Sequence, residues 1–347
     1  MEVREECMLA TCEKQPLSAT SDIVYCKCLT IILALLCVLP VGTLAQKADT
    51  AQNPPAPLGK LFDVGGYRVH LYCTGTGSPT VVILGADYSF DWGLVQPEIA
   101  AITQICAYDH SGSAWSDKGP KDSCALRVQE VHTALKNAGI AGPYVLVGHS
   151  LGAVITRLYA AQYPDEVAGA VFIDHAFAMI NRRPASGAPA TTATTTPPMP
   201  PPPASAPAGR IALGMTDDPN FSKLPARDID LHRWWGAQAQ GNPLSMADML
   251  DCIAQADASI KGQIYSFGDK PLVDVSAAGT LRPAPPAVAE ERASKYAELQ
   301  TKLLSLSTNS KQIVAENSGH FIIIDRPDVV IDAIGQVVHS VRNNTKL

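Results

Sequence analysis

Short apolar runs alternate with amphipathic stretches along the middle of the chain. Four runs are of the buried-strand type: 80–84 (TVVIL), 105–108 (ICAY), 144–147 (YVLV) and 167–173 (VAGAVFI). Residues 124–138 and 151–163 repeat apolar positions at helical spacing, and Gly139 and Pro164 follow their ends. Strands separated by helices predict an α/β fold, with a mostly parallel sheet covered by helices on both faces.

Further elements lie on either side of this block. The alternating segment 67–73 (YRVHLYC) predicts a strand, and 270–276 and 312–315 predict two more. Helices are expected at 289–304 and 327–341, where apolar residues again recur with helical period. The second half of the chain therefore returns to the strand–helix alternation of the first.

The pattern breaks between residues 181 and 268. Residues 184–209 are rich in proline, threonine and alanine, a composition that cannot bury a core, and we expect them to be disordered. The remainder of the insertion has helical spacing. It contains the large apolar side chains Phe221, Trp234, Trp235 and Met246. We therefore expect 181–268 to form a lid inserted between two core parts, 59–180 and 269–347.

The amino-terminal segment carries an apolar run, 29–44, which Lys27 precedes. The run leads into Thr43-Leu44-Ala45, with small side chains at the two places that a signal peptidase needs. This pattern predicts a signal peptide over 1–45 and a secreted or periplasmic protein. The run is short for a spanning helix, so no stable membrane span is expected, and anchoring by the same run is the alternative. Residues 46–58 are polar and contain prolines, which is typical of a flexible linker.

The acidic stretch before Lys27 is long for the first part of a signal peptide. Initiation at Val24 would give a compact signal with one lysine and an apolar centre. The position of the true start is therefore an open alternative.

Charge excludes one class of partner. The chain has 27 basic and 33 acidic side chains and a formal net charge of −6. Nucleic-acid binding needs a concentrated basic face, which this balance does not provide. We expect a small-molecule substrate and no nucleic acid.

Four cysteines lie beyond the predicted signal: Cys73, Cys106, Cys124 and Cys252. An even number in an exported chain fits disulfides, and three pairings are possible. We favour the bridge between Cys124 and Cys252, which both lie near the insertion; four buried thiols are the alternative. No C-x-x-C pair occurs in this part, so no metal site of thiolates is expected.

A G-x-S-x-G motif, Gly148-His149-Ser150-Leu151-Gly152, joins the apolar run 144–147 to the helical segment that follows. A strand, a sharp turn and a helix are the setting in which a nucleophilic serine is exposed. Glycines at both ends leave room where a side chain would strike a neighbouring strand or helix. We therefore predict Ser150 as the nucleophile.

A serine hydroxyl needs a base to react at neutral pH. Of the eight histidines, His320 follows the last predicted strand, at the edge of the sheet where sites in open α/β sheets form. Where a nucleophilic serine lies between a strand and a helix, the catalytic histidine comes after the serine in the chain, as His320 does. We predict His320 as the general base.

A carboxylate must hold the imidazole in one tautomer. Asp174 ends the strand after the nucleophile and is our choice, whereas an aspartate that only caps a loop is the alternative. Glu290 and Glu291 remain candidates, although they fall in a predicted helix. Asp274 lies inside a predicted strand and would point into the packing of the sheet.

An oxyanion hole needs two backbone N–H groups. The Leu151 N–H, at the start of the predicted helix, is expected to be the first. The second should come from the loop after 80–84, where Ala86 or Asp87 is the donor.

The segments around these residues resemble the α/β-hydrolase superfamily, in particular its small bacterial esterase-like members. The resemblance extends over 62–176 and 271–341 and includes GPYVLVGHSLGAV and SGHFIIIDRPDVV. It implies an α/β-hydrolase fold with an inserted helical lid, and Ser-His-acid hydrolysis of carboxylic esters without a cofactor. Two positions depart from the pattern. The loop GADYSF is shorter and bulkier than in many relatives, and His110 stands where relatives often have arginine.

The sequence leaves three functions open. The first is a carboxylic ester hydrolase whose small-molecule substrate has an apolar acyl or alcohol part. The second is an acyltransferase or a cofactor-free perhydrolase that uses the same three side chains. The third is a non-catalytic binding protein that keeps the fold.

Overall fold

The computed structural model describes residues 54–85, 88–175, 218–238, 246–262, 265–278 and 285–347. The predicted signal peptide, the proline-rich stretch 184–209, and Ala86 and Asp87 all lie outside these ranges. Among the described residues, no helix is long and apolar enough to cross a membrane.

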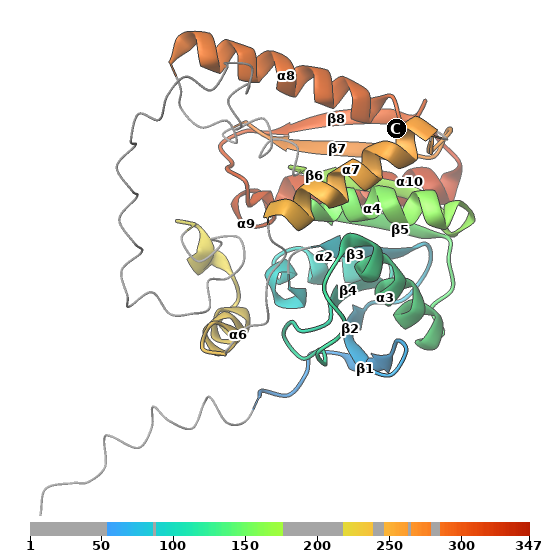
Figure 1. Ribbon diagram of the computed structural model, residues 1–347, viewed down its shortest axis with the longest axis vertical. Coiled ribbons are helices and arrows are strands. Elements are labelled where there is room, and N and C mark those ends of the chain that lie inside the picture. Colours follow the sequence, from blue (N-terminus) through green and yellow to red (C-terminus); the bar gives the residue numbers. More distant parts are fainter. Residues whose placement is uncertain (1–53, 86–87, 176–217, 239–245, 263–264, 279–284) are drawn as a thin grey trace, which may run out of the picture. The chain divides into compact units, whose positions relative to one another are not determined.

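Eight strands form one sheet in the order β1-β2-β4-β3-β5-β6-β7-β8 (Figure 1). The strands are β1 (Lys60–Asp63), β2 (Arg68–Thr74), β3 (Thr80–Gly85), β4 (Ile105–Asp109), β5 (Tyr144–His149), β6 (Val167–Ile173), β7 (Leu272–Ala277) and β8 (Ser310–Ala315). Only β2 pairs antiparallel with its neighbours, β1 and β4, and every other pair is parallel. The predicted, mostly parallel sheet is confirmed.

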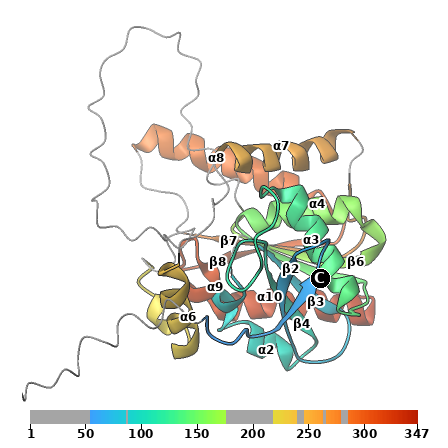
Figure 2. The same cartoon turned by 60° about the horizontal axis from the view of Figure 1, so that its bottom comes forward.

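Helices cover both faces of this sheet. The α-helices are α2 (Gln96–Ala100), α3 (Cys124–Asn137), α4 (Leu151–Gln162), α6 (Ala226–Gly236), α7 (Met246–Gly262), α8 (Pro286–Leu304), α9 (Ile322–Asp325) and α10 (Pro327–Asn343). Short 3-10 helices are η1 (Ser89–Trp92), η2 (Pro164–Glu166) and η4 (Phe221–Lys223). Figure 2 shows α3, α4, α7 and α8 on one side of the sheet, and α2 and α10 on the other.

Alternating strand residues build two apolar cores, one on each face. In β3, Val82 and Leu84 pack with α3 and α4, whereas Val81 and Ile83 pack with α2 and α10. All four side chains are buried, because each face of a central parallel strand lies beneath helices. This double burial is why the run TVVIL is continuously apolar.

Two disulfides tie elements on the sheet. Cys124 is bonded to Cys252, which joins the first turn of α3 to α7, and this is the pairing that we favoured. Cys73 and Cys106 face each other on β2 and β4 and form the second bridge. The alternative of four separate thiols is therefore wrong.

Candidate active site

Ser150 lies at the turn between β5 and α4 with φ 55° and ψ −120°. A positive φ is costly for a residue with a side chain, and it persists only where the surroundings enforce it. Here the Ser150 N–H continues the ladder to β6, since it donates to the carbonyl of Ile173 at 2.9 Å. The sheet thus holds the serine at the point where the chain turns sharply into α4.

The two flanking glycines allow this turn. A methyl group on Gly152 would overlap the Leu84 carbonyl oxygen and lie 2.9 Å from the Gly85 Cα. A methyl group on Gly148 would overlap the Gly152 carbonyl and lie 2.5 Å from the Thr156 hydroxyl. The start of α4 therefore lies directly against the end of β3, and only glycine fits between them.

We expect Gly152→Ala to lower the free energy of unfolding by about 1–3 kcal/mol, because the added methyl group must displace backbone of β3. Thermal or denaturant unfolding measures this change. Gly335→Ala is the matched control, since nothing lies within 4 Å of the added Cβ on α10. It should leave stability unchanged or raise it slightly. Equal effects of the two substitutions would contradict the close approach described here.

Ser150, His320 and Asp174 are joined by consecutive hydrogen bonds. The Ser150 Oγ lies 3.0 Å from Nε2 of His320, and Nδ1 of His320 lies 2.6 Å from Oδ2 of Asp174. With the ring proton on Nδ1, the imidazole donates to Asp174 and accepts from the serine hydroxyl. The structure thus brings together the three residues that the sequence predicted for one site, although Ser150 and His320 lie 170 residues apart in the chain.

Asp174 is held by the backbone at the end of β6. Its N–H donates to the Val275 carbonyl at 2.8 Å, and its Oδ1 accepts from the Ala277 N–H at 3.4 Å. The residue is fully buried and has φ 37°. Glu290 and Glu291, the other candidates for the acid, lie on α8 with exposed side chains.

His149 supports His320 in a way that sequence reasoning did not foresee. Its Nε2 lies 2.8 Å from the backbone carbonyl of His320, to which it donates. The two rings lie 4.8 Å apart, and His149 is fully buried. The residue beside the serine in the motif therefore fixes the main chain of the histidine.

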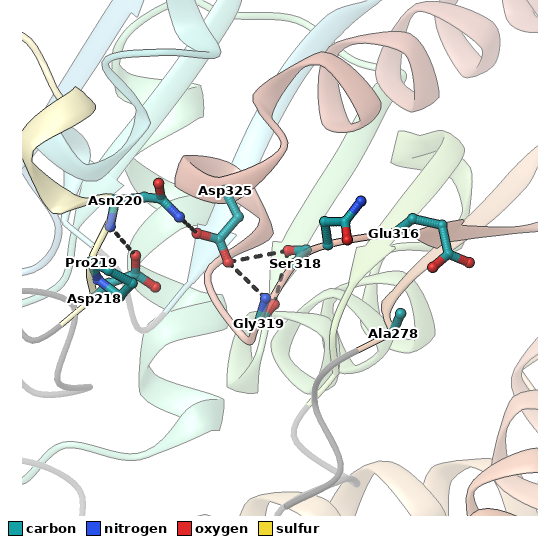
Figure 3. Close-up of a pocket in the computed structure, with 9 residues that line it drawn as sticks. Asp218, Pro219, Asn220, Ala278, Glu316, Ser318, Gly319 and Asp325 are labelled. Atoms are coloured by element: carbon teal, nitrogen blue, oxygen red, sulfur yellow. Dashed lines mark hydrogen bonds between the residues drawn. The ribbon is translucent and has the colours of Figure 1, made fainter.

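Asp325, in α9, holds the loop that carries His320. It accepts from the Gly319 N–H at 2.7 Å and from the Ser318 hydroxyl at 3.3 Å. Its other oxygen accepts from the Asn220 side chain at 2.6 Å, which links the insertion to this loop (Figure 3). Sequence reasoning missed this residue as well.

A cavity of about 560 Å³ lies beside this loop (Figure 3). Its described lining comes from three places in the chain: Asp218, Pro219, Asn220, Ala278, Glu316, Asn317, Ser318, Gly319 and Asp325. Neither Ser150 nor His320 is among these residues. The cavity therefore adjoins the histidine loop without containing the reacting atoms.

Of the predicted oxyanion donors, the structure describes Leu151. It is the first residue of α4, and its side chain is buried. The first N–H groups of a helix have no partner within the helix and carry a partial positive charge. The other two predicted donors, Ala86 and Asp87, lie outside the described residues.

Helix α6 covers η1, the 3-10 helix that follows the predicted oxyanion loop with Ala86 and Asp87. Trp235 meets Tyr88 edge to face with ring centres 5.9 Å apart, and Trp234 stacks on Trp115 at 5.2 Å. The buried His232 lies 2.8 Å from the Asp91 carboxylate of η1. The side chain of Met246, the fourth large residue noted in the insertion, lies outside the described part.

Asp274 is the second buried carboxyl of the region. It lies within β7, fully buried, as the sequence predicted. Burial in the sheet raises its pKa to about 8, and the nearby charge of Asp174 adds to the effect. Asp274 is therefore largely protonated at neutral pH.

This pKa predicts how stability depends on pH. The folded protein keeps the Asp274 proton up to about pH 8, whereas the unfolded chain loses it near pH 4. Rising pH between these values therefore lowers the free energy of unfolding, by about 1.4 kcal/mol per pH unit. We expect the stability of Asp274→Asn relative to the wild type to increase as pH rises from 4 to 8.5.

Unfolding midpoints at several pH values measure this divergence. Asp332→Asn, at an exposed carboxylate on α10, is the control and should follow the wild type. A stability difference between Asp274→Asn and wild type that stays constant from pH 4 to 8.5 would refute the raised pKa of Asp274.

His110 directly follows β4. It stands where proteins of the family that the sequence resembles often have arginine. Its Nδ1 donates to the Ser111 carbonyl at 3.0 Å. Burial, together with the nearby charge of Arg127, lowers its pKa to about 4, so the ring is neutral at pH 7. We find no contact between His110 and the Ser150–His320 pair in the described structure.

Comparisons with known proteins agree with this architecture. A family model described as "alpha/beta hydrolase fold" matches residues 79–196. An uncharacterised protein of Schizosaccharomyces pombe is 32% identical over 178 residues, which are 42% of this chain and 33% of that protein. The uncharacterised protein YqjL of Bacillus subtilis is 24% identical over 288 residues, 80% of this chain and 91% of YqjL. This chain thus spans a third of the first relative and most of the second.

The solved structure of a thermophilic esterase from Thermogutta terrifontis shares the fold. It superposes with a TM-score of 0.50 at 17% identity, over 79% of this chain and 94% of the esterase. Together with the strand order and the family match, this shows that the chain has the α/β-hydrolase fold.

Proposed function

We propose that the protein is a serine hydrolase that cleaves carboxylic esters through an acyl-enzyme on Ser150. The observation that carries this proposal is the chain of hydrogen bonds from the Ser150 hydroxyl through His320 to Asp174, with distances of 3.0 and 2.6 Å. A nucleophile, a base and an orienting acid in that order are the parts that acyl transfer requires.

In the first half of the reaction, Ser150 Oγ attacks the ester carbonyl carbon while Nε2 of His320 takes its proton. The imidazolium is stabilised by the Asp174 carboxylate at Nδ1. When the tetrahedral intermediate collapses, the bond to the alcohol oxygen breaks and His320 gives the proton to the departing alcohol. The acyl group remains on Ser150.

In the second half, water attacks the acyl-enzyme. Nε2 of His320 accepts a proton from the water, and the proton returns to Ser150 Oγ as the carboxylic acid leaves. The carbonyl oxygen carries negative charge in both tetrahedral intermediates. The Leu151 N–H at the start of α4 is the first donor to it, and Ala86 or Asp87 is the second.

An apolar acyl or alcohol part fits the surroundings best. Tyr88, Phe90 and Trp235 form a buried aromatic cluster around η1, immediately after the predicted oxyanion loop. Aromatic side chains offer large apolar surface at low conformational cost. The esterase that shares the fold supports an ester as the substrate.

Hydrolysis of p-nitrophenyl esters with acyl chains of two to twelve carbons tests the proposal. We expect activity that depends on chain length and is abolished in Ser150→Ala. Product analysis with added alcohol or hydrogen peroxide separates hydrolysis from acyl transfer and perhydrolysis. A wild type that cleaves none of these esters, or a Ser150→Ala variant that cleaves them normally, would refute the proposal.

We also propose that the protein is exported. Two disulfides in one folded domain are typical of an oxidising compartment. Together with the apolar run 29–44, they favour removal of a signal peptide after Ala45. Amino-terminal sequencing of the exported protein should find Gln46 first, and finding Met1 there would refute cleavage.

A further inference from the structure

An asparagine of the insertion binds the carboxylate that holds the histidine loop. Asn220 is the residue before η4, and its Nδ2 donates to Oδ1 of Asp325 at 2.6 Å. The other oxygen of Asp325, Oδ2, accepts from the Gly319 N–H at 2.7 Å and from the Ser318 hydroxyl at 3.3 Å (Figure 3). A continuous row of hydrogen bonds thus runs from the insertion to the residue before His320.

The main chain around Asn220 is itself anchored. The Asn220 N–H donates to Oδ1 of Asp218 at 2.7 Å, which closes a tight turn. Leu224, directly after η4, is buried and belongs to the same apolar core as Phe321. The amide of Asn220 therefore reaches Asp325 from a segment that is packed against the body of the protein.

His320 has a main-chain contact on each of its sides. Its carbonyl accepts from Nε2 of His149 at 2.8 Å, and the N–H of the residue before it, Gly319, is bound by Asp325. Glycine restricts its own backbone less than any other residue, so the course of the chain at Gly319 depends on that contact. The contact therefore helps to place the imidazole 3.0 Å from the Ser150 hydroxyl.

The contact with Asn220 sets the direction of the Asp325 carboxylate. The two oxygens of a carboxylate are held rigidly to each other, so a donor at Oδ1 also determines where Oδ2 points. The last torsion of an aspartate side chain has only a broad preference of its own. Its orientation here is consequently a result of its partners, Asn220 on one oxygen and the histidine loop on the other.

We propose that Asn220 is a positioning residue for the general base, which it serves by fixing the Asp325 carboxylate and with it the loop that carries His320. The inference rests on the proposed function, in which His320 takes the proton of Ser150. It makes the insertion a part of the catalytic unit as well as a cover. A misplaced base lowers the rate of proton transfer without removing a contact to the substrate, so the loss should fall on kcat.

Asn220→Asp tests this role with little change in shape. At about pH 8 it sets one carboxylate against another, so the donor to Asp325 is lost and the two groups repel. We expect kcat for p-nitrophenyl acetate to fall by about 10- to 10²-fold, with KM changed less than about threefold. Asn220→Ala should lower kcat by about fivefold, because water in the adjoining cavity can replace part of the lost contact.

Exchanging the two groups is the sharpest test. In the double variant Asn220→Asp, Asp325→Asn, the amide introduced at position 325 donates to the carboxylate introduced at position 220. Its oxygen still accepts from the Gly319 N–H, so the row of hydrogen bonds is restored with one link reversed. We expect kcat to return to within about threefold of the wild type, a recovery that two independent destabilising changes would not produce.

Asn137→Asp is the matched control. Asn137 is the exposed last residue of α3, and its side-chain amide donates to the Asp63 carbonyl of β1 at 2.8 Å. β1 lies at the opposite edge of the sheet from β8, the strand that leads to the histidine loop. This variant makes the same substitution at another hydrogen-bonded amide and should keep wild-type kcat and KM. Unfolding midpoints show which variants are folded.

A folded Asn220→Asp variant with wild-type kcat would overturn the inference and leave the proposed function standing. So would a folded double variant as impaired as Asn220→Asp, or an equal loss in Asn137→Asp. If Asn220→Asp does not fold, Asn220→Ala decides, and an unchanged kcat there overturns the inference. A wild type that hydrolyses no ester would overturn the proposed function and this inference with it.

Discussion

Replacing Ser150 with alanine, or His320 with glutamine, is expected to lower kcat for ester hydrolysis by on the order of 10⁶-fold. The serine is the only described hydroxyl bonded to His320, and the imidazole is the only described base within 3.0 Å of it. Without either group, the remaining donors stabilise an oxyanion that no longer forms efficiently. Steady-state kinetics of purified variants measure the loss.

His339→Gln is the control for the histidine substitution, because His339 is exposed on α10 and far along the chain from the site. It should retain full activity, and all three variants should unfold near the wild-type midpoint. If His320→Gln kept more than about a tenth of the wild-type kcat, His320 would not be the general base.

Asp174→Asn is expected to lower kcat by about 10⁴-fold while the fold is retained. An amide can donate to Nδ1 and so favour the wrong tautomer, in which Nε2 carries the proton and cannot accept from Ser150. The 2.6 Å bond between Asp174 and His320 is the contact that this change reverses. Kinetics with a short-chain ester test the loss of kcat, and a melting curve tests whether the fold is retained.

Three further carboxyl variants show whether the effect is specific to Asp174. Glu290→Gln and Glu291→Gln, at exposed positions on α8, should keep wild-type kcat. Asp274→Asn should keep most of the activity at pH 7, because its carboxyl is already neutral there. A loss in any of these as large as that in Asp174→Asn would reassign the acid.

The sheet was predictable because its central strands are buried on both faces. The continuous apolar runs that became β3, β5 and β6 carry a signal that needs no tertiary information. β1 and α9 were missed for the opposite reason. β1 is a four-residue strand with a partly exposed KLFD sequence, and α9 has only four residues, too few for a period to emerge.

The sequence also predicted which residues meet at the site, because the carboxyl ends of neighbouring parallel strands lie at one edge of a sheet. Ser150, Asp174 and His320 each follow a strand in the set β5, β6 and β8. The supporting residues were not predictable in the same way. His149 bonds a carbonyl 171 residues away, and Asp325 bonds a side chain 105 residues away, and no local pattern reveals such contacts.

The most direct test of a nucleophilic Ser150 is to label the protein with a fluorophosphonate and map the modified peptide by mass spectrometry. Our account predicts one label, on Ser150, absent from Ser150→Ala and formed far more slowly in His320→Gln. An unlabelled wild type, or a label on another residue that persists in Ser150→Ala, would contradict it.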